Sequence, residues 1–218
     1  MSKIAWVTGA SGLVGQQLVA QLSQDPNFSK VIAFVRTTLE LPIFQDDKVE
    51  QFVVDFDKLV APSTKVDALF CALGSTTKKS PNYDDFYKID VTYPYEFAKL
   101  GKTKDARFYG LVSAHGAHQK SLSSYLKMKG LLEKDLSKLL YANLVFARPS
   151  LLKGDRKEFR LLEKLSESVV SLMPGNYKAI HAKNVAASLI TAAKNSTEKN
   201  RILTSKDMQK PEKICFSK

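Results

Sequence analysis

A tyrosine and a lysine four residues apart are the side chains whose spacing most directly suggests chemistry. Tyr125 and Lys129 would lie one turn apart on the same face of a helix. A free phenol has a pKa near ~10 and exchanges protons poorly at neutral pH, whereas a nearby ammonium stabilises the phenolate and lowers that pKa. Ser113, which ends an apolar run earlier in the chain, could hydrogen-bond a substrate carbonyl. The three side chains could therefore carry proton transfer at an oxygen-bearing carbon.

A second tyrosine and lysine have the same spacing, and they must be weighed against the first pair. Tyr95 and Lys99 are also four residues apart, and such pairs are expected by chance in a lysine-rich chain. Tyr95 lies in a charged stretch with no strand-ending serine before it. We therefore interpret Tyr95 and Lys99 as an ordinary helix surface, and Tyr125 and Lys129 as the functional pair.

A glycine-rich turn near the N-terminus predicts a phosphate-binding site. The apolar run Lys3–Thr8 is typical of a strand, and three glycines follow it in the pattern GxxGxxG. The first glycine permits a tight turn, the second lets backbone approach a pyrophosphate, and the third permits close packing of helix on strand. The N-terminus of the following helix offers free N–H groups to an anion. The expected dinucleotide contacts are Gly9, Ser11, Gly12, Leu13, Val14 and Gly15.

The residue after the second expected strand indicates which dinucleotide the site prefers. About 20 positions beyond the glycine turn, NAD sites usually carry an acid for the ribose hydroxyl, and NADP sites use an arginine for the 2′-phosphate. Arg36 occupies this position, and no acid follows until Glu40. Because a guanidinium matches phosphate geometry, the sequence favours NADP(H) over NAD(H). The alternative is that Arg36 is a solvated surface charge.

Short apolar runs alternate with longer stretches of helical periodicity along the chain. This alternation predicts a Rossmann-like, doubly wound α/β fold with a parallel sheet and helices on both faces. We expect one domain over residues 1–218, with the cofactor half at about 1–150 and a small C-terminal substrate cap at about 151–218. The expected strands are Lys3–Thr8, Val31–Val35, Gln51–Val54, Val66–Leu73, Phe108–Ser113 and Asn143–Ala147, with a short extended piece at Lys178–His181. The expected helices are Leu13–Leu22, Asp84–Leu100, Ser121–Leu140, Arg156–Leu172 and Asn184–Lys194.

Several of these motifs together resemble a known family. Thr8–Gly15 (TGASGLVG) is similar to the glycine turn of extended and atypical short-chain dehydrogenases. Over roughly residues 1–155, the order and spacing of further segments resemble the Tat-interacting oxidoreductase group of that family. Those segments are Cys71–Thr77 (CALGSTT), Val112–Ala117 (VSAHGA), Tyr125–Gly130 (YLKMKG) with Glu133, and Arg148–Ser150 (RPS).

The resemblance implies a nicotinamide cofactor that supplies the hydride, whereas the glycine spacing alone leaves flavin or nucleotide-sugar binding open. It also implies that Ser113, Tyr125 and Lys129 are the catalytic residues, with Tyr125 and Lys129 also in contact with the cofactor. Two departures, Ser150 and the lack of an acid after His181, leave the substrate unidentified. The remaining cofactor contacts implied by the resemblance are Asp55 and Phe56 around the adenine and Leu73 and Gly74 beside the nicotinamide ribose.

Three functional hypotheses follow. The first is an NADP(H)-dependent oxidoreductase that transfers a hydride to or from a carbonyl or alcohol substrate. The second is an NADPH-binding regulator or sensor with little turnover, because only 218 − 149 = 69 residues follow Pro149 to build a substrate lobe. The third is a nucleotide-sugar epimerase or dehydratase, but such enzymes usually prefer NAD and need a larger substrate lobe.

The composition is that of a globular protein with an excess of basic residues. Hydrophobic residues make up 44% of the chain, but no apolar run reaches the roughly 18 residues of a membrane span. Two cysteines and no visible secretory signal lead us to expect a cytoplasmic protein, either monomer or homodimer. The net charge of +11 comes from scattered lysines without a nucleic-acid motif, so nucleic acid is not an expected partner. The three histidines lack metal-ligand spacing, and no metal site is expected.

Overall fold

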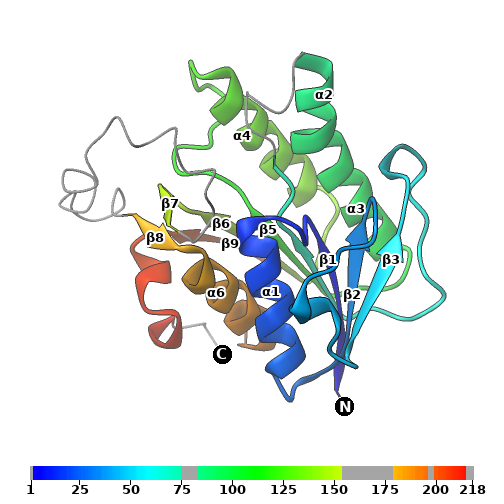
Figure 1. Cartoon of the computed structure of the whole chain (residues 1–218). Helices are drawn as coiled ribbons and strands as arrows, with labels where there is room; N and C mark the ends of the chain where they lie inside the picture. Colours follow the sequence, from blue (N-terminus) through cyan, green and yellow to red (C-terminus); the bar gives the residue numbers. More distant parts are fainter. Residues whose placement is uncertain (1, 75–82, 154–178, 196–198, 215–218) are drawn as a thin grey trace.

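A seven-stranded parallel sheet forms the centre of the computed structural model, which describes residues 2–74, 83–153, 179–195 and 199–214 (Figure 1). The strand order is β3-β2-β1-β4-β5-β6-β9, so the chain winds outward from β1 and then returns to β4 on its other side. This reversal is the switch point of a doubly wound Rossmann-like sheet, where such folds bind ligands. The strands are β1 (Lys3–Thr8), β2 (Phe28–Val35), β3 (Val49–Val53), β4 (Ala68–Cys71), β5 (Phe108–Val112), β6 (Asn143–Arg148) and β9 (Asn200–Thr204).

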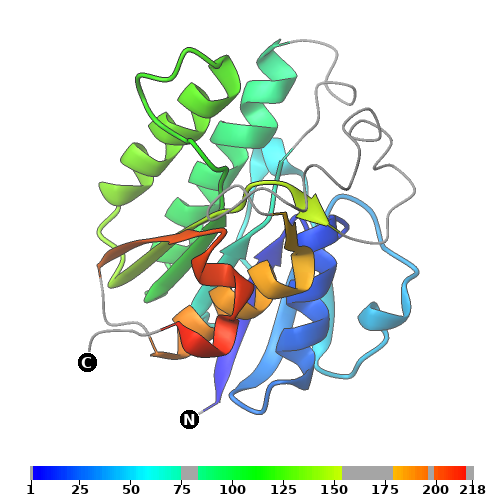
Figure 2. The same ribbon diagram turned by 90° about the vertical axis from the view of Figure 1, so that its left-hand side faces the viewer.

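Helices cover both faces of the sheet, as the sequence predicts (Figure 2). Helices α1 and α6 pack on one face, and α3 and α4 pack on the other. Alternate residues of each strand serve the two cores, so Val7 is buried under α1 while Trp6 is buried on the opposite face. The described helices are α1 (Leu13–Gln24), α2 (Tyr83–Tyr87), α3 (Tyr93–Lys102), α4 (Ser124–Ser137) and α6 (Ala182–Asn195).

An irregular turn joins α2 to α3. The residues Lys88–Thr92 form a π turn, so the chain stays helical from α2 through α3. Pro94 lies just inside α3, where it lacks an N–H group and its ring would collide with the carbonyl four residues earlier, at Asp90. The proline therefore explains the irregularity, and turns of this type occur frequently at functional sites.

Most elements lie where the sequence predicts them, with ends shifted by a few residues. The expected helix Ser121–Leu140 is shorter, since α4 spans Ser124–Ser137. The strand β9 was not predicted at all. A second, two-stranded sheet pairs β7 (Leu152–Lys153) with β8 (Ile180–His181), at the expected extended piece. The expected helix Arg156–Leu172 lies outside the described residues.

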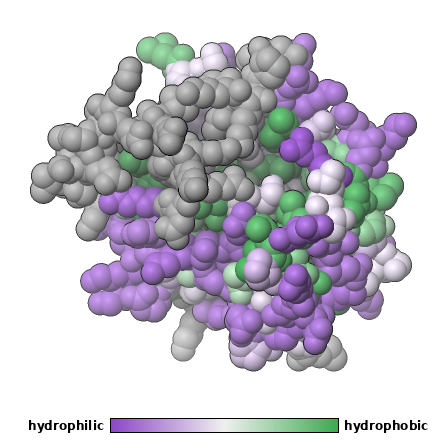
Figure 3. All heavy atoms as spheres, in the orientation of Figure 1, coloured by the Kyte–Doolittle hydropathy of each residue, from purple (hydrophilic) through white to green (hydrophobic). Residues whose placement is uncertain are grey.

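The surface agrees with a basic chain whose charges are scattered. Figure 3 shows hydrophilic side chains spread over much of the visible face, with smaller hydrophobic patches between them. Within the described ranges, no helix is both long enough and apolar enough to cross a membrane. Within the same ranges, no three potential metal ligands of the His, Cys, Asp or Glu type are grouped together.

Candidate active site

The glycine turn after β1 has the geometry of a phosphate cradle. Gly9 has a positive φ of 75°, and a β carbon there would lie 2.4 Å from the carbonyl oxygen of Ala72. A β carbon on Gly15 would lie 2.0 Å from the carbonyl oxygen of Gly9. Gly12 caps α1 without a side chain, and the first turn of this helix carries no acidic residue. The helix N-terminus is therefore open to an anion.

The other predicted residues of this turn differ in what they can offer a ligand. Ser11 is exposed and Leu13 is half-buried. The side chain of Val14 is buried in the core under α1, so only its backbone can face a ligand. The amide of Gly12 donates a hydrogen bond of 2.8 Å to the carbonyl of Gly9, which holds the turn together.

A cleft of about 640 Å³ brings Arg36, Asp55 and Phe56 together at the ends of β2 and β3. Asp55 caps the short 3-10 helix Phe56–Lys58, because its side chain accepts a hydrogen bond of 2.9 Å from the backbone N–H of Asp57. Phe56 is buried in the core, whereas Arg36 is exposed. The structure thus gathers three predicted contacts from separate parts of the chain around one cavity.

Contacts from the helical segment 83–102 close one side of this cleft. Lys88 forms an ion pair with Asp57 at 3.1 Å, and the Tyr93 hydroxyl donates to the same carboxylate oxygen at 3.1 Å. These hydrogen bonds, that of Lys88 first, lower the pKa of Asp57. The π turn that carries Lys88 therefore also contributes to the wall of the cleft.

Lys129 is held by a buried partner. Its ammonium lies 2.8 Å from a carboxylate oxygen of Asp90, and the two side chains are 2% and 0% exposed. Burial alone would lower the pKa of Lys129, but the Asp90 carboxylate outweighs it and the pKa is raised. A β carbon on Gly74 would lie 3.6 Å from the same Asp90 carboxylate, so the carboxyl end of β4 meets this ion pair.

The phenol of Tyr125 lies beside this ion pair. The Lys129 ammonium is 5.8 Å from the centre of the Tyr125 ring, and the Phe86 ring is 6.0 Å away on the other helix. Burial of the phenol raises its pKa, Lys129 lowers it and Asp90 raises it again, so that the pKa of Tyr125 is above its usual value. Lys129 lowers this pKa as the sequence predicts, but the expected net fall is wrong, because burial of the phenol, together with the Asp90 carboxylate, outweighs the lysine.

Ser113, which follows β5, belongs to a second buried network around Glu133, and Glu133 lies one helical turn after Lys129 on α4. Its hydroxyl donates to Glu133 at 2.5 Å, and Glu133 is 5% exposed. Arg148 donates to the same carboxylate through Nε at 3.0 Å and through Nη2. The hydroxyl hydrogen of Ser113 therefore points at Glu133, and the oxygen keeps its lone pairs for another donor.

Tertiary structure adds three residues to the predicted site: Asp90, Glu133 and Arg148. Each is a charged side chain that pairs with a partner from another element, and sequence spacing alone gives no signal for such pairs. In the competing pair, Lys99 is exposed on α3 and forms an ion pair with Glu96 at 3.0 Å, in which both charges are about half exposed. Tyr95 is partly buried against the core, so the interpretation as helix surface holds for Lys99 but not fully for Tyr95.

The proteins with similar sequences include one from a mammal and several from yeasts. The chain is 33% identical over 184 residues to "Protein HTATIP2" of Rattus norvegicus, a match that covers 83% of this chain and 76% of that protein. It is 32% identical over 206 residues to "Protein FMP52-1, mitochondrial" of Scheffersomyces stipitis, which covers 89% and 90% respectively. No family model matches the chain.

Solved structures share the fold at low sequence identity. An oxidoreductase of the short-chain dehydrogenase/reductase family from Burkholderia thailandensis has a TM-score of 0.74 at 16% identity, with 95% of this chain and 93% of that chain covered. MoeE5, solved in complex with UDP-glucuronic acid and NAD, has a TM-score of 0.70 at 15% identity, covering 91% of this chain and 75% of the other.

A doubly wound parallel sheet with a glycine turn after β1 defines a Rossmann-like protein of the dinucleotide-binding type. The sequence matches narrow this class of dinucleotide-binding proteins to one family. The chain belongs to the atypical short-chain dehydrogenase/reductase family, in the group of the Tat-interacting protein HTATIP2.

The cytoplasmic location expected from the sequence is wrong by these comparisons. FMP52-1 and the FMP52 proteins of further yeasts bear names that end in "mitochondrial". The expectation failed because few cysteines and a missing secretory signal argue only against secretion. They do not separate one internal compartment from another.

Proposed function

We propose that the protein is an NADP(H)-dependent oxidoreductase that acts on a small carbonyl or alcohol substrate. One observation carries the proposal: the phosphate cradle and the Tyr125–Lys129 pair meet at the end of β4. Gly9 packs against the backbone of Ala72, and two residues later Gly74 faces the carboxylate of Asp90, which holds Lys129. A dinucleotide on the cradle would therefore reach the proton-transfer residues along this strand end.

The preference for NADP(H) rests on Arg36. This arginine is exposed at the mouth of the 640 Å³ cleft, where the 2′-phosphate of the adenine ribose would lie. The predicted contacts Asp55 and Phe56 line the same cleft and would face the adenine. When bound, the cofactor supplies or accepts the hydride. Leu73 and Gly74, at the end of β4, would lie beside the nicotinamide ribose.

The side chains of this protein would handle the proton. The neutral hydroxyl of Tyr125 would give its proton to the substrate oxygen during carbonyl reduction. Lys129 would stabilise the phenolate left behind until solvent restores the proton. Ser113, with its hydrogen on Glu133, would accept a hydrogen bond from an alcohol substrate or from the phenol and so position it. We further propose that the region at about 151–218 forms the substrate side of the same domain.

A second candidate function is an NADPH-binding sensor with little turnover. The observation that favours it is that the polar groups of the site are already paired with one another. Asp90 neutralises Lys129, and Glu133 takes the hydrogen of Ser113. A nucleotide-sugar epimerase has support from the fold shared with MoeE5, but Arg36 is an NADP-type residue and counts against it.

The experiment combines a binding measurement with a turnover measurement on the whole chain. NADPH and NADH are titrated by fluorescence, and NADPH oxidation is then followed across a panel of aldehydes, ketones and quinones. The oxidoreductase proposal expects tighter binding of NADPH than of NADH and turnover of at least one carbonyl class. Tight NADPH binding without turnover would favour the sensor, and absence of binding would overturn both.

A further inference from the structure

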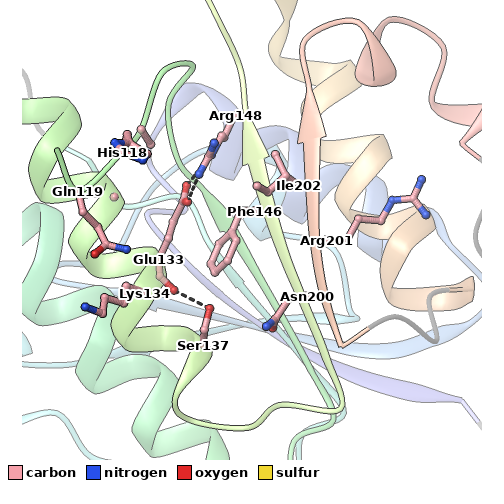
Figure 4. Close-up of a pocket in the computed structure, with 12 residues that line it drawn as sticks. His118, Gln119, Glu133, Lys134, Ser137, Phe146, Arg148, Asn200, Arg201 and Ile202 are labelled. Carbon is pink, nitrogen blue, oxygen red and sulfur yellow. Dashed lines mark hydrogen bonds and ion pairs between the residues drawn. The ribbon is translucent and has the colours of Figure 1, made fainter. Parts of the chain in front are cut away.

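A second pocket lies on the far side of α4 from the cofactor cleft. It has a volume of about 270 Å³ and shares no lining residue with the cleft that contains Arg36. Figure 4 shows its walls, which come from α4 on one side and from β6 and β9 on the other. We call it the α4–β9 pocket.

One wall of the α4–β9 pocket is apolar and open. Phe146 on β6 and Ile202 on β9 are neighbours in register, and both face the α4 side of the sheet. Phe146 is buried, but Ile202 is 45% exposed. The next residue, Leu203, points to the opposite face and is fully buried in the core under α1 and α6. The sheet thus leaves an apolar surface at this edge that a ligand could cover.

Cationic side chains line the pocket from both walls, with Arg148 on β6 and Lys134 on α4. Arg148 uses two of its five N–H groups on Glu133, and within the described residues the others have no partner. Lys134, one residue after Glu133 on α4, is exposed and has no ion-pair partner within the same residues. The single acid of the pocket, Glu133, is already bound by Arg148 and Ser113. The Arg148 guanidinium therefore lies beside the apolar residues of the sheet, and the flexible side chain of Lys134 lines the pocket at α4.

We propose that the α4–β9 pocket is a second ligand site, which binds a small organic acid. Its carboxylate would lie between the free edge of Arg148 and the ammonium of Lys134, and its apolar body would lie on Phe146 and Ile202. A carboxylate accepts hydrogen bonds from guanidinium and ammonium groups and matches the charge of these two side chains. The volume suits a compact acid with an aromatic or branched body and is too small for a dinucleotide.

Hydrogen bonds connect the α4–β9 pocket to the proposed catalytic residue Ser113. The guanidinium that would bind the ligand also holds Glu133, and Glu133 holds the hydroxyl of Ser113. Occupancy of the pocket would thus act on a side chain that already positions Ser113. The binding claim itself does not depend on the proposed oxidoreductase activity.

The test uses benzoate as the probe and benzamide as its uncharged counterpart. Protein with labelled isoleucine methyl groups is titrated by NMR, with and without NADPH. Benzoate is expected to shift the methyl signal of Ile202 saturably, with a Kd of about 1–10 mM for so small a ligand. The signal of Ile89, which lines the cofactor cleft, should stay unmoved by benzoate. Benzamide should bind at least about tenfold more weakly, since it lacks the charge.

Two substitutions and one control locate the binding. Lys134→Gln is expected to weaken benzoate binding several-fold, and Ile202→Asp should abolish it by placing a carboxylate on the apolar wall. Lys127→Gln removes an exposed lysine of the same helix that does not line the pocket, and it should change nothing. An unmoved Ile202 signal at about 20 mM benzoate, equal binding of benzamide, or equal losses in Lys134→Gln and Lys127→Gln would overturn the proposal.

Discussion

The glycine turn and the Tyr125–Lys129 region lie at the same edge of the sheet but are built in opposite ways. The turn consists of backbone, with Gly9 and Gly15 in contacts that leave no room for a β carbon, and the N-terminus of α1 that follows is open to a ligand. Around Tyr125, buried charges pair with each other, as Lys129 does with Asp90. The glycine turn can therefore bind an anionic ligand, whereas the charge of Lys129 is already neutralised by Asp90 of the same chain.

The difference separates affinity from reactivity. An open cradle favours cofactor binding without any change in the protein. At the proton-transfer site, Lys129 lowers the pKa of the Tyr125 phenol and the Asp90 carboxylate raises it, so the two charges act on turnover in opposite directions. Substitutions in the glycine turn should therefore change mainly NADPH binding, and substitutions around Tyr125 should change mainly turnover.

The largest effect is expected at Gly15. A β carbon in Gly15→Ala would meet the Gly9 carbonyl at 2.0 Å, and neither backbone can move away easily. We expect a loss of about 3 kcal/mol in the free energy of unfolding, and NADPH binding should be lost with it. Gly74→Ala is the matched control, since its nearest contact is an ordinary 3.6 Å. Denaturant titration measures both, and equal stability of the two variants would contradict the geometry of the turn.

Asp90→Ala tests the buried ion pair between Lys129 and Asp90. It leaves the ammonium of Lys129 buried without a charge partner, which should cost about 3 kcal/mol of stability, an effect comparable to that at Gly15. Glu96→Ala breaks the exposed pair with Lys99 and should cost about 0.5 kcal/mol or less. If thermal and denaturant unfolding show similar losses for the two variants, the Lys129–Asp90 pair is not buried as described.

Arg36→Gln should change cofactor choice with little change in the fold. Loss of a charge-assisted hydrogen bond to a phosphate weakens binding by about 1.5–3 kcal/mol, or roughly 10- to 100-fold, for NADPH only. NADH affinity should hardly change. Arg107→Gln, at an exposed arginine that does not line the cleft, serves as the control. Equal losses for both cofactors would show that Arg36 does not contact a 2′-phosphate.

The smallest effect is a shift in pH dependence for Asp90→Asn. The negative charge of Asp90 helps to raise the pKa of Tyr125, so a neutral asparagine should let this pKa fall. Alcohol oxidation needs the phenolate, and its rate should therefore rise at lower pH than in the unchanged protein. Carbonyl reduction needs the neutral phenol, and its alkaline decline should move to lower pH as well. Unmoved profiles in both directions would mean that Asp90 has no influence on the phenol.

The same two regions show what a sequence can predict. The glycine turn depends mainly on neighbours within eight residues, since Gly12 and Gly15 both approach Gly9 and Gly9 has a positive φ, so the pattern alone located it. Only the contact of Gly9 with Ala72 is long-range. Arg36, Asp55 and Phe56 follow strand ends, which periodicity identifies, and the structure places them around one cleft. The sheet and its helices followed from apolar periodicity in the same way.

Long-range pairing could not be predicted in this way. Asp90 meets Lys129, and Glu133 meets Arg148, only because separate elements pack together. The strand β9 was missed because it is a short edge strand in which polar and apolar residues mix, with exposed Asn200 and Ile202. The net rise in the pKa of Tyr125 was missed for the same reason, since burial of the phenol, its largest cause, and the Asp90 carboxylate both depend on how separate elements pack.

We propose that Tyr125 transfers the proton in an NADP(H)-dependent reaction. Two tyrosine-to-phenylalanine variants, one in each Tyr–Lys pair, test this role. NADPH binding and carbonyl turnover are measured for Tyr125→Phe and for Tyr95→Phe, which alters the pair on the surface of α3. The account predicts that Tyr125→Phe lowers turnover by about 10²–10⁴-fold with NADPH affinity retained, and that Tyr95→Phe matches the unchanged protein. Full turnover in Tyr125→Phe would contradict the account.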